Sequence, residues 1–213
     1  TLTGTRQKVA NYAGVTVERK EGSFKLPSGD AIRVLDLPGT YSLKPSSLDE
    51  EVTRAVCLGE LKGEVLPDIF ICVVDATNLS LHLSLVLEVR ALNRPMILVL
   101  NMMDEVKKRG ISIDKDKLSQ LLGIPVVEAV AVKTKGIQDL INQLDQKNLF
   151  ITPYHSELSH FEQVKQITKQ VILNNDSGDK RTAFLDKIFL HPVLGLVILT
   201  LTMFVMFQAV FIW

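Results

Sequence analysis

The chain has 213 residues with 24 basic and 24 acidic side chains, so its formal net charge is zero. A broad nucleic-acid-binding face needs a basic excess, and the balanced charge argues against nucleic acid as a partner. Apolar residues make up 46% of the chain, which is ample for a core, and the length fits one or two domains. Cys57 and Cys72 have no metal-ligand spacing, and we expect both to be buried, reduced thiols.

Strands alternating with helices are expected along the first 150 residues. Two strands are expected at 17–26 and 31–35, joined by a turn, and a helix is expected to begin near Ser47, where Ser47-Leu48-Asp49-Glu50 matches a capping box. Further strands are expected at 68–74, 96–100 and 126–132, and further helices at 79–92, 115–122 and 137–144. This alternation predicts an α/β fold with a mostly parallel, doubly wound sheet.

The pattern changes after about Phe150. One amphipathic helix is expected at 160–174, and no further strand is expected. The stretch Val193–Trp213 is almost wholly apolar and long enough for a membrane-spanning helix, which needs roughly 20 residues. Basic side chains precede it at Lys180, Arg181 and Lys187, so the positive-inside rule places the preceding part of the chain in the cytoplasm.

The tetrapeptide Asn101-Met102-Met103-Asp104 directly follows the apolar run Met96–Leu100. Asn-x-x-Asp at the end of a buried strand is how GTP-binding domains distinguish guanine from adenine. The Asp104 carboxylate can accept hydrogen bonds from both the ring N1–H and the exocyclic amine of guanine. Adenine has no such donor pair and would leave the carboxylate unpaired, at a cost of roughly 1–3 kcal/mol. We therefore expect Asn101, Met102 and Asp104 to contact a guanine nucleotide.

The segment Asp36-Leu37-Pro38-Gly39 follows the expected strand 31–35. An Asp at such a strand end can hold Mg²⁺ through water, and the Gly three residues later lets its backbone N–H approach a γ-phosphate. We expect Asp36, Pro38 and Gly39 to lie at the nucleotide. The alternative interpretation is an ordinary Pro-Gly turn.

Two further segments complete the predicted site. In Gly14-Val15-Thr16, the Thr16 hydroxyl can bind Mg²⁺ and its amide the γ-phosphate, in a loop ordered only by the triphosphate. Thr16 could alternatively be a β-branched residue entering a strand. The segment Ala131-Val132-Lys133 could place backbone amides and a Lys stem against guanine, although the usual Ser-Ala-Lys is absent. It could equally be an ordinary strand-to-helix loop.

The strings around these residues resemble ferrous iron transport protein B. Besides the motifs above, the resemblance rests on Val9-Ala10-Asn11-Tyr12-Ala13-Gly14-Val15-Thr16-Val17-Glu18, Thr40-Tyr41-Ser42-Leu43, Val74-Asp75-Ala76-Thr77-Asn78-Leu79, Asp186-Lys187-Ile188 and His191-Pro192-Val193-Leu194-Gly195. It implies a Ras-like P-loop GTPase fold at 1–150, a short helical spacer at 151–190 and a transmembrane helix at 191–213.

The resemblance also implies a function. GTP and GDP would bind with Mg²⁺, and Thr16, Asp36 and Gly39 would serve hydrolysis coupled to Fe²⁺ uptake at the bacterial inner membrane. Some members use K⁺ near the phosphates, held partly by the loop around Asn11-Tyr12, and small accessory Feo proteins are expected partners. Thr40 follows Gly39 where Ras-like enzymes carry a water-orienting Gln, so slow hydrolysis is expected.

The sequence departs from the family pattern at its start. The family's phosphate-binding Gly-x-x-x-x-Gly-Lys-Ser/Thr and the strand before it belong upstream of Thr1, so poor GTP binding and negligible hydrolysis are expected of this chain. Without that central strand, apolar surface and unpaired backbone should be exposed on both neighbouring strands. Two alternatives remain: a non-catalytic, membrane-tethered remnant that binds a partner, and a soluble GTPase of translation or tRNA modification.

Overall fold

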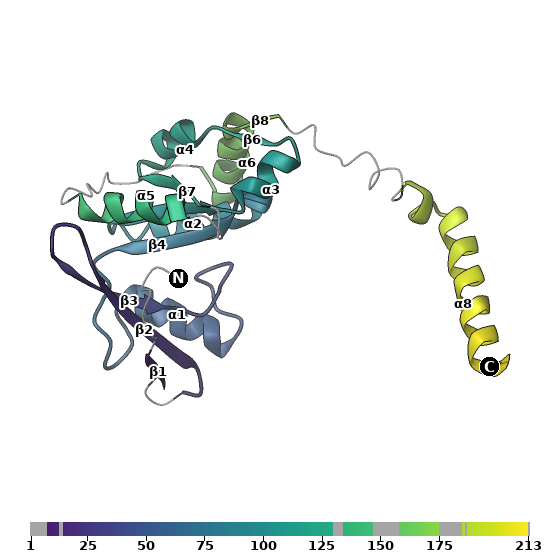
Figure 1. The fold of residues 1–213 in the computed structure, drawn as a ribbon, viewed down its shortest axis with the longest axis horizontal. Helices are drawn as coiled ribbons and strands as arrows, with labels where there is room; N and C mark the ends of the chain where they lie inside the picture. The colour runs from purple at the N-terminus through teal and green to yellow at the C-terminus, as the bar shows by residue number, and fades with distance from the viewer. Residues whose placement is uncertain are drawn as a thin grey trace.

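The computed structural model describes residues 8–12, 15–129, 134–146, 158–174, 185 and 187–212 (Figure 1). Its strands are β1 Lys8–Asn11, β2 Glu18–Lys25, β3 Ala31–Asp36, β4 Phe70–Asp75, β5 Met96–Asn101, β6 Ser112–Ile113, β7 Val126–Glu128 and β8 Ile172–Asn174. Its helices are α1 Leu48–Leu58, the 3₁₀ helix η1 Ala76–Asn78, α2 Leu79–Arg90, α3 Met103–Lys108, α4 Lys115–Leu122, α5 Thr134–Asp145, α6 His160–Val171 and α8 Leu194–Ile212.

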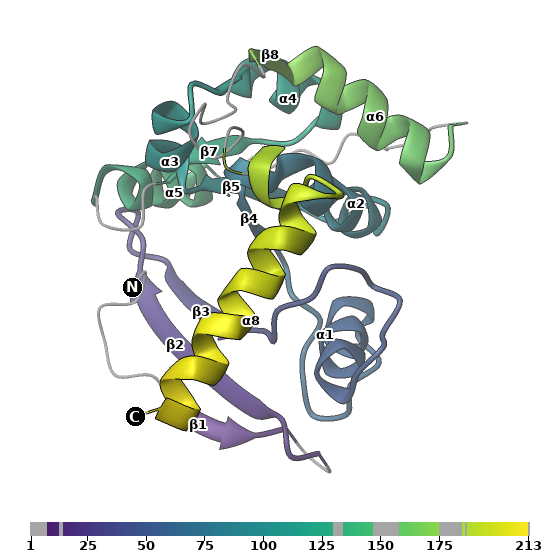
Figure 2. The same ribbon diagram turned by 90° about the vertical axis from the view of Figure 1, so that its right-hand side faces the viewer.

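The first three strands form an antiparallel sheet in the order β1-β2-β3 (Figure 2). The turn between β2 and β3 closes with the Leu26 N–H donating to the Asp30 carbonyl over 2.8 Å, and Gly29 adopts a φ of 96° that favours glycine. Val52 and Val56 of α1 pack with Tyr12 and Val17 at the other end of the hairpin. The expected strand pair and the helix that follows it are therefore confirmed.

The next three strands form a parallel sheet in the order β4-β5-β7. Met96, Leu98 and Leu100 of β5 belong to a core formed with α2, α4 and α6, whereas Ile97 and Val99 face a second core with α5. Successive side chains of a strand point to opposite faces, so an all-apolar strand indicates a sheet covered on both sides. The prediction of a doubly wound α/β fold is confirmed, and Figure 1 shows helices on both faces.

No strand pairing connects the two sheets within the described residues. Among the described residues, β3 pairs only with β2 and β4 only with β5, and no strand lies between β3 and β4. Val73 on the free edge of β4 is 59% exposed. Strands of parallel sheets are normally buried on both faces, so this exposure of Val73 is unusual for such a strand.

Only one of the two hydrogen bonds of the expected capping box forms at the N-terminus of α1. Ser47 accepts a hydrogen bond from the Glu50 N–H over 3.3 Å. The Glu50 carboxylate, however, does not return to Ser47 and instead accepts from the Ser46 N–H and hydroxyl at 2.8 and 2.6 Å. These hydrogen bonds lower the pKa of Glu50 below its usual range.

The segment after Phe150 corrects one expectation. The helix predicted at 160–174 ends at Val171, and Ile172–Asn174 forms β8, which pairs antiparallel with β6. The Asp114 N–H also donates to the Val171 carbonyl over 2.9 Å. The backbone of β6 offers partners that a local pattern does not reveal, so tertiary pairing ends the helix early. Ile167 and Val171 of α6 belong to the core that also contains α2 and α4.

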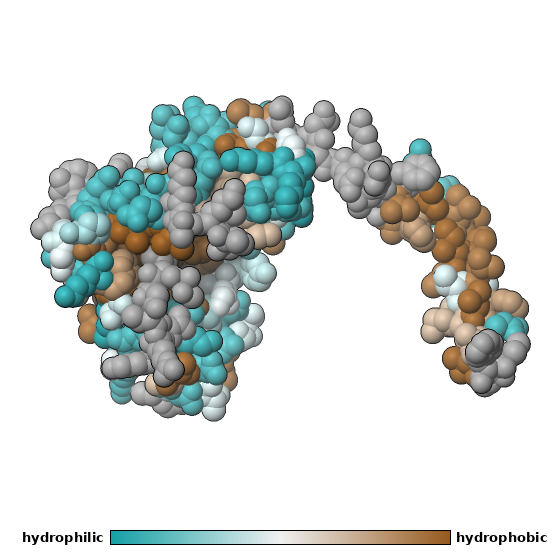
Figure 3. Space-filling view, viewed as in Figure 1, coloured by the Kyte–Doolittle hydropathy of each residue, from teal (hydrophilic) through white to brown (hydrophobic). Residues whose placement is uncertain are grey.

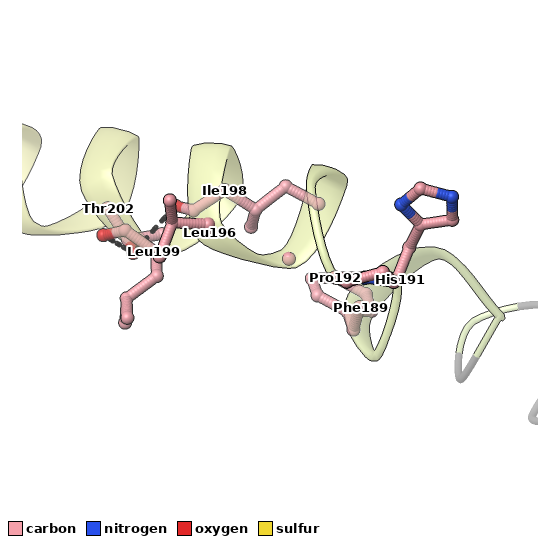
Figure 4. A pocket seen from close by; sticks show the side chains of 8 residues that line it. Phe189, His191, Pro192, Leu196, Ile198, Leu199 and Thr202 are labelled. Carbon is pink, nitrogen blue, oxygen red and sulfur yellow. Dashed lines mark hydrogen bonds between the residues drawn. The ribbon is translucent and has the colours of Figure 1, made fainter.

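The last described helix, α8, has few polar groups, and the helix itself satisfies several of them. The His191 Nδ1 accepts from the backbone N–H groups of Val193 and Leu194 at its start, and the Thr200 hydroxyl donates to the Leu196 carbonyl over 2.8 Å. The shallow hollow in Figure 4 lies along one side of this helix and its leading turn, and encloses no cavity of the core. Figure 3 shows the apolar surface of α8 in brown.

Within the residues that the structure describes, no helix combines the length and apolar character that crossing a membrane requires. The prediction that residues 191–213 form a transmembrane helix stays a prediction, because that range extends beyond the described residues. The described part of it contains α8, which has 19 residues.

Candidate functional site

The carboxyl ends of the parallel strands meet at one edge of the sheet. Asp75 at the end of β4 is the register partner of Asn101 at the end of β5, and Leu100 is opposite Glu128 of β7. In open α/β sheets, ligands bind beyond this edge. The structure thus places Asn101 where a nucleotide-binding residue belongs.

The segment after Asn101 turns sharply into a helix. Met102 has a φ of 63°, in the left-handed region, and α3 begins at the next residue. Asp104 lies in the first turn of α3 with an exposed side chain that makes no hydrogen bond to the described residues. A carboxylate in this state can accept two donors from a ligand.

Asp75 is a site residue that motif reasoning did not assign. Its Oδ1 accepts from both the N–H and the hydroxyl of Thr77, each at 2.8 Å. Burial raises the pKa of Asp75, but the Thr77 hydrogen bonds and the nearby charges of His82 and Arg109 together lower the pKa below its usual value. The ionised carboxylate fixes the turn between β4 and α2. The pairing of an Asp with a Thr two residues later was the available sequence signal.

The loop after β3 presents its two key groups to solvent. The Asp36 carboxylate is exposed and has no hydrogen-bond partner among the described residues. The Thr53 hydroxyl on α1 donates to the Pro38 carbonyl over 2.9 Å and holds the loop from behind. No atom lies within 4 Å of the position that a Cβ on Gly39 would occupy, so a ligand can reach its backbone closely.

Thr16 lies in the short connection between β1 and β2. The Tyr12 N–H donates to the Val17 carbonyl over 3.1 Å, and the exposed Thr16 lines an open hollow of about 600 Å³ beside Val15 and Leu48. Because β1 ends and β3 ends near the same part of β2, Thr16 and Asp36 lie toward one end of the antiparallel sheet.

Tyr12, beneath this connection, is 2% exposed, and its hydroxyl has no partner in the described part of the chain. Burial raises its pKa, and the nearby negative charge of Glu64 adds to this.

The strand pairing brings some predicted residues together and leaves others apart. Thr16 and Asp36 lie at the antiparallel sheet, whereas Asn101, Met102 and Asp104 lie at the end of β5 in the parallel one. Within the described part of the chain, no strand joins the two groups. Gly14, Ala131, Val132 and Lys133 lie outside the described residues, so their predicted roles stay predictions.

The donor set at Thr16 and Asp36 fits Mg²⁺. A hydroxyl and a carboxylate are the hard oxygen ligands that this ion prefers, and it ordinarily keeps several waters and binds substrate phosphates beside one or two carboxylates. Neither side chain is engaged elsewhere among the described residues. Those residues also contain no group of three or more His, Cys, Asp or Glu side chains that could hold a metal by themselves.

Comparisons with known proteins identify the family of this chain. A family model described as ferrous iron transport protein B matches residues 1–144. The Fe(2+) transporter FeoB of Salmonella typhimurium is 43% identical over 166 residues, which cover 76% of this chain. The chain belongs to the ferrous iron transport protein B family.

Solved structures of the family share the fold. The cytosolic domain of T. maritima FeoB in its GMPPNP form superposes with a TM-score of 0.66 and 31% identity, covering 81% of this chain and 92% of that one. The cytosolic domain of L. pneumophila FeoB gives a TM-score of 0.72 and 29% identity, covering 81% and 91%. Family membership sets aside the alternative of a translation or tRNA-modification GTPase.

The match covers a limited part of the longer relatives. The chain spans about a fifth of the length of the Salmonella transporter, since the matched part is 20% of that protein. The family model matches residues 1–144, which include the strands whose ends carry the predicted nucleotide-binding residues.

Proposed function

We propose that this chain is the guanine-nucleotide-binding part of a bacterial ferrous iron uptake protein. One observation carries the proposal: Asp104 presents an exposed carboxylate without a partner among the described residues, directly beyond the carboxyl edge of the parallel sheet. Relatives of the family were solved in GMPPNP and GDP forms, which supports GTP and GDP as the ligands.

Each predicted residue has a role in the proposal. Asp104 accepts from guanine, Asn101 braces the loops around it, and Met102 shapes the turn through its left-handed backbone. Ala131, Val132 and Lys133 are proposed to complete the guanine side from the loop before α5.

The phosphate side is proposed to consist of two loops. Gly14, Val15 and Thr16 approach from the β1–β2 connection, and Asp36, Pro38 and Gly39 from the end of β3. Thr16 and Asp36 would hold Mg²⁺, which neutralises charge on the phosphates when bound. The exposed Gly39 amide donates toward the γ-phosphate, so the loop distinguishes GTP from GDP.

The remaining proposals concern the whole protein. We infer that it admits Fe²⁺ at the bacterial inner membrane, with this domain in the cytoplasm and small accessory Feo proteins as partners. The Fe(2+) transporter name of the relatives supports the transported ion. K⁺ beside Asn11 and Tyr12 is proposed as a further ligand near the phosphates. The division into residues 1–150, 151–190 and 191–213 also stays a proposal.

The test is a switch of base specificity. Asp104→Asn replaces one acceptor by a donor, so guanine loses a hydrogen bond while xanthine, with an oxygen in place of the amine, gains one. We expect the affinity for GDP to fall about 5- to 150-fold, which corresponds to roughly 1–3 kcal/mol, and the affinity for xanthosine diphosphate to rise. Because weak binding is expected, ¹H–¹⁵N chemical-shift titration is the suitable measurement.

Asp116→Asn on α4 is the matched control, since Asp116 is also exposed and its side chain makes no hydrogen bond or ion pair with the described residues. Unchanged preference in Asp104→Asn, or GDP binding to the native chain no tighter than ADP binding, would contradict the proposal. The second result would favour a remnant that binds a protein partner.

A further inference from the structure

The loop that follows Gly39 is held on two helices. On the α1 side, Thr53 binds the Pro38 carbonyl, and Glu50 accepts from the Thr40 hydroxyl over 3.3 Å. On the α2 side, the loop meets Glu88 and His82. The exposed glycine therefore lies between fixed points, and its own surface is left open.

The contacts with Glu88 are the most direct of these. The Ser42 hydroxyl lies 3.1 Å from Oε1 and 2.9 Å from Oε2 of Glu88, and the Leu43 N–H donates to Oε2 over 2.5 Å. Both donors end on one partly buried carboxylate, and hydrogen bonds to charged groups contribute more than neutral ones. The Lys44 N–H donates in turn to the Ser42 hydroxyl oxygen over 3.0 Å, which extends the anchor by one residue.

Two apolar contacts reinforce the same attachment. The Tyr41 ring stacks on His82, with ring centroids 5.6 Å apart and planes inclined by 23°. The Leu43 side chain packs against the core that contains α2. Tyr41 thus contacts α2 through its ring, Ser42 through its hydroxyl, and Leu43 through its backbone amide and its side chain.

The helix that contains Glu88 also packs against α6, the helix of the proposed spacer. α2 packs against α6, whose Ile167 and Val171 enter the same core as Leu83, Val86 and Leu87 of α2. The loop and the spacer helix are therefore attached to one rigid element on different sides of it.

We propose that Glu88 is a positioning residue that fixes the loop from Gly39 to Leu43 on α2 and so sets its position relative to the spacer helix α6. The proposal rests on the proposed function for one step, that Gly39 faces the γ-phosphate. The attachment itself needs no nucleotide. If the loop moves when the γ-phosphate is lost, either the Glu88 contacts break or α2 moves together with the loop. In this series of contacts, α2 therefore lies between the nucleotide and α6.

The test is hydrogen–deuterium exchange of the full chain without nucleotide. Glu88→Gln keeps the size of the side chain but removes the charge and one of the two acceptor oxygens. We expect the amides of Leu43 and Lys44 to exchange at least about tenfold faster, since charge-assisted hydrogen bonds are lost. The amides of β5, at 97–100, should keep their protection, and the urea midpoint should fall little.

Glu51→Gln on α1 is the matched control, because Glu51 is exposed and its side chain makes no hydrogen bond or ion pair with the described residues. Ser42→Ala is the second variant, and it removes one donor without altering the helix; it should show the same localised loss in smaller measure. Unchanged exchange at Leu43 in both variants, or a uniform increase that includes β5, would overturn the proposal. Because no nucleotide is present, absence of GDP binding would count against the proposed function alone.

Discussion

Carboxylates divide into two groups at the scale of single residues. Glu50, Glu64, Asp75 and Glu88 each accept hydrogen bonds from donors of this chain, and Glu64 bridges Arg19 and Arg33 on the sheet. Asp36 and Asp104 have no hydrogen bond or ion pair with the described residues. A carboxylate left unpartnered is free for ligand donors. Glu51 and Asp116 are also exposed without such contacts, so what distinguishes Asp36 and Asp104 is their position at or just beyond a strand end.

The cysteines allow a prediction about pH. Burial raises the pKa of Cys57 to about 11 and that of Cys72 to about 12, whereas an unfolded thiol titrates near 8.5. Above pH 8.5 the unfolded state loses these protons before the folded state does, so the unfolded state binds fewer protons and the free energy of unfolding falls as pH rises toward 11. We expect the urea midpoint to be lower at pH 10 than at pH 8.

A Cys57→Ala, Cys72→Ala double variant should lose most of this pH dependence, although it is less stable overall. Alkylation by iodoacetamide at pH 8 should likewise be more than about 100-fold slower in the native chain than in 8 M urea, because only the thiolate reacts. Equal rates in the two conditions would contradict the burial of Cys57 and the partial burial of Cys72.

At the scale of elements, a glycine allows α5 to pack closely against the end of β7. A Cβ on Gly136, near the start of α5, would come within 2.7 Å of the Ala129 Cα and 2.8 Å of the Glu128 carbonyl oxygen. Both are backbone atoms and cannot rotate away. The glycine therefore lets the helix approach the end of the strand, next to the proposed guanine-binding loop.

Gly136→Ala should destabilise the chain by about 1–3 kcal/mol, as overpacking against backbone generally does. Gly39→Ala is the matched comparison, since the same methyl group would meet no atom within 4 Å there. We expect it to change stability by less than about 0.5 kcal/mol. Chemical denaturation measures both, and equal losses in the two variants would show that the contact at Gly136 is unimportant.

The whole molecule consists of a packed α/β body and an apolar helix. None of the described residues of α8 belongs to a core cluster. Apart from the half-buried Ile198, its large apolar side chains between Leu194 and Val210 are 48% to 71% exposed. Exposed apolar surface on this scale associates with other apolar surface. The free edge of β4 adds a smaller exposed patch around Val73.

Deleting residues 185–213 should therefore turn an aggregating or detergent-dependent chain into one that elutes as a discrete species without detergent. Size-exclusion chromatography of both forms, with and without a mild detergent, measures the change. Aggregation that persists after the deletion would identify the sheet edge at β4 as the main source.

Much of the architecture was predictable because it depends on local patterns. Helix α4 was predicted with its observed bounds, since Asp114 caps it and Gly123 ends it in the left-handed conformation. Strand β5 was predicted because an all-apolar run bounded by Pro95 and Asn101 fits a buried strand. Asp36 and Asp104 were assigned from spacing alone, and the structure leaves both available.

By itself, the sequence determined the α/β class and the family, and it supplied the motif residues that we propose recognise guanine, because periodicity and short motifs are local properties. Tertiary structure alone decided the rest. β8 formed because β6 offered a backbone partner, and Glu50 left its capping position because Ser46 and Thr40 compete for its carboxylate. The attachment of Ser42 and Leu43 to Glu88 joins residues more than 40 positions apart, so no local pattern could predict it.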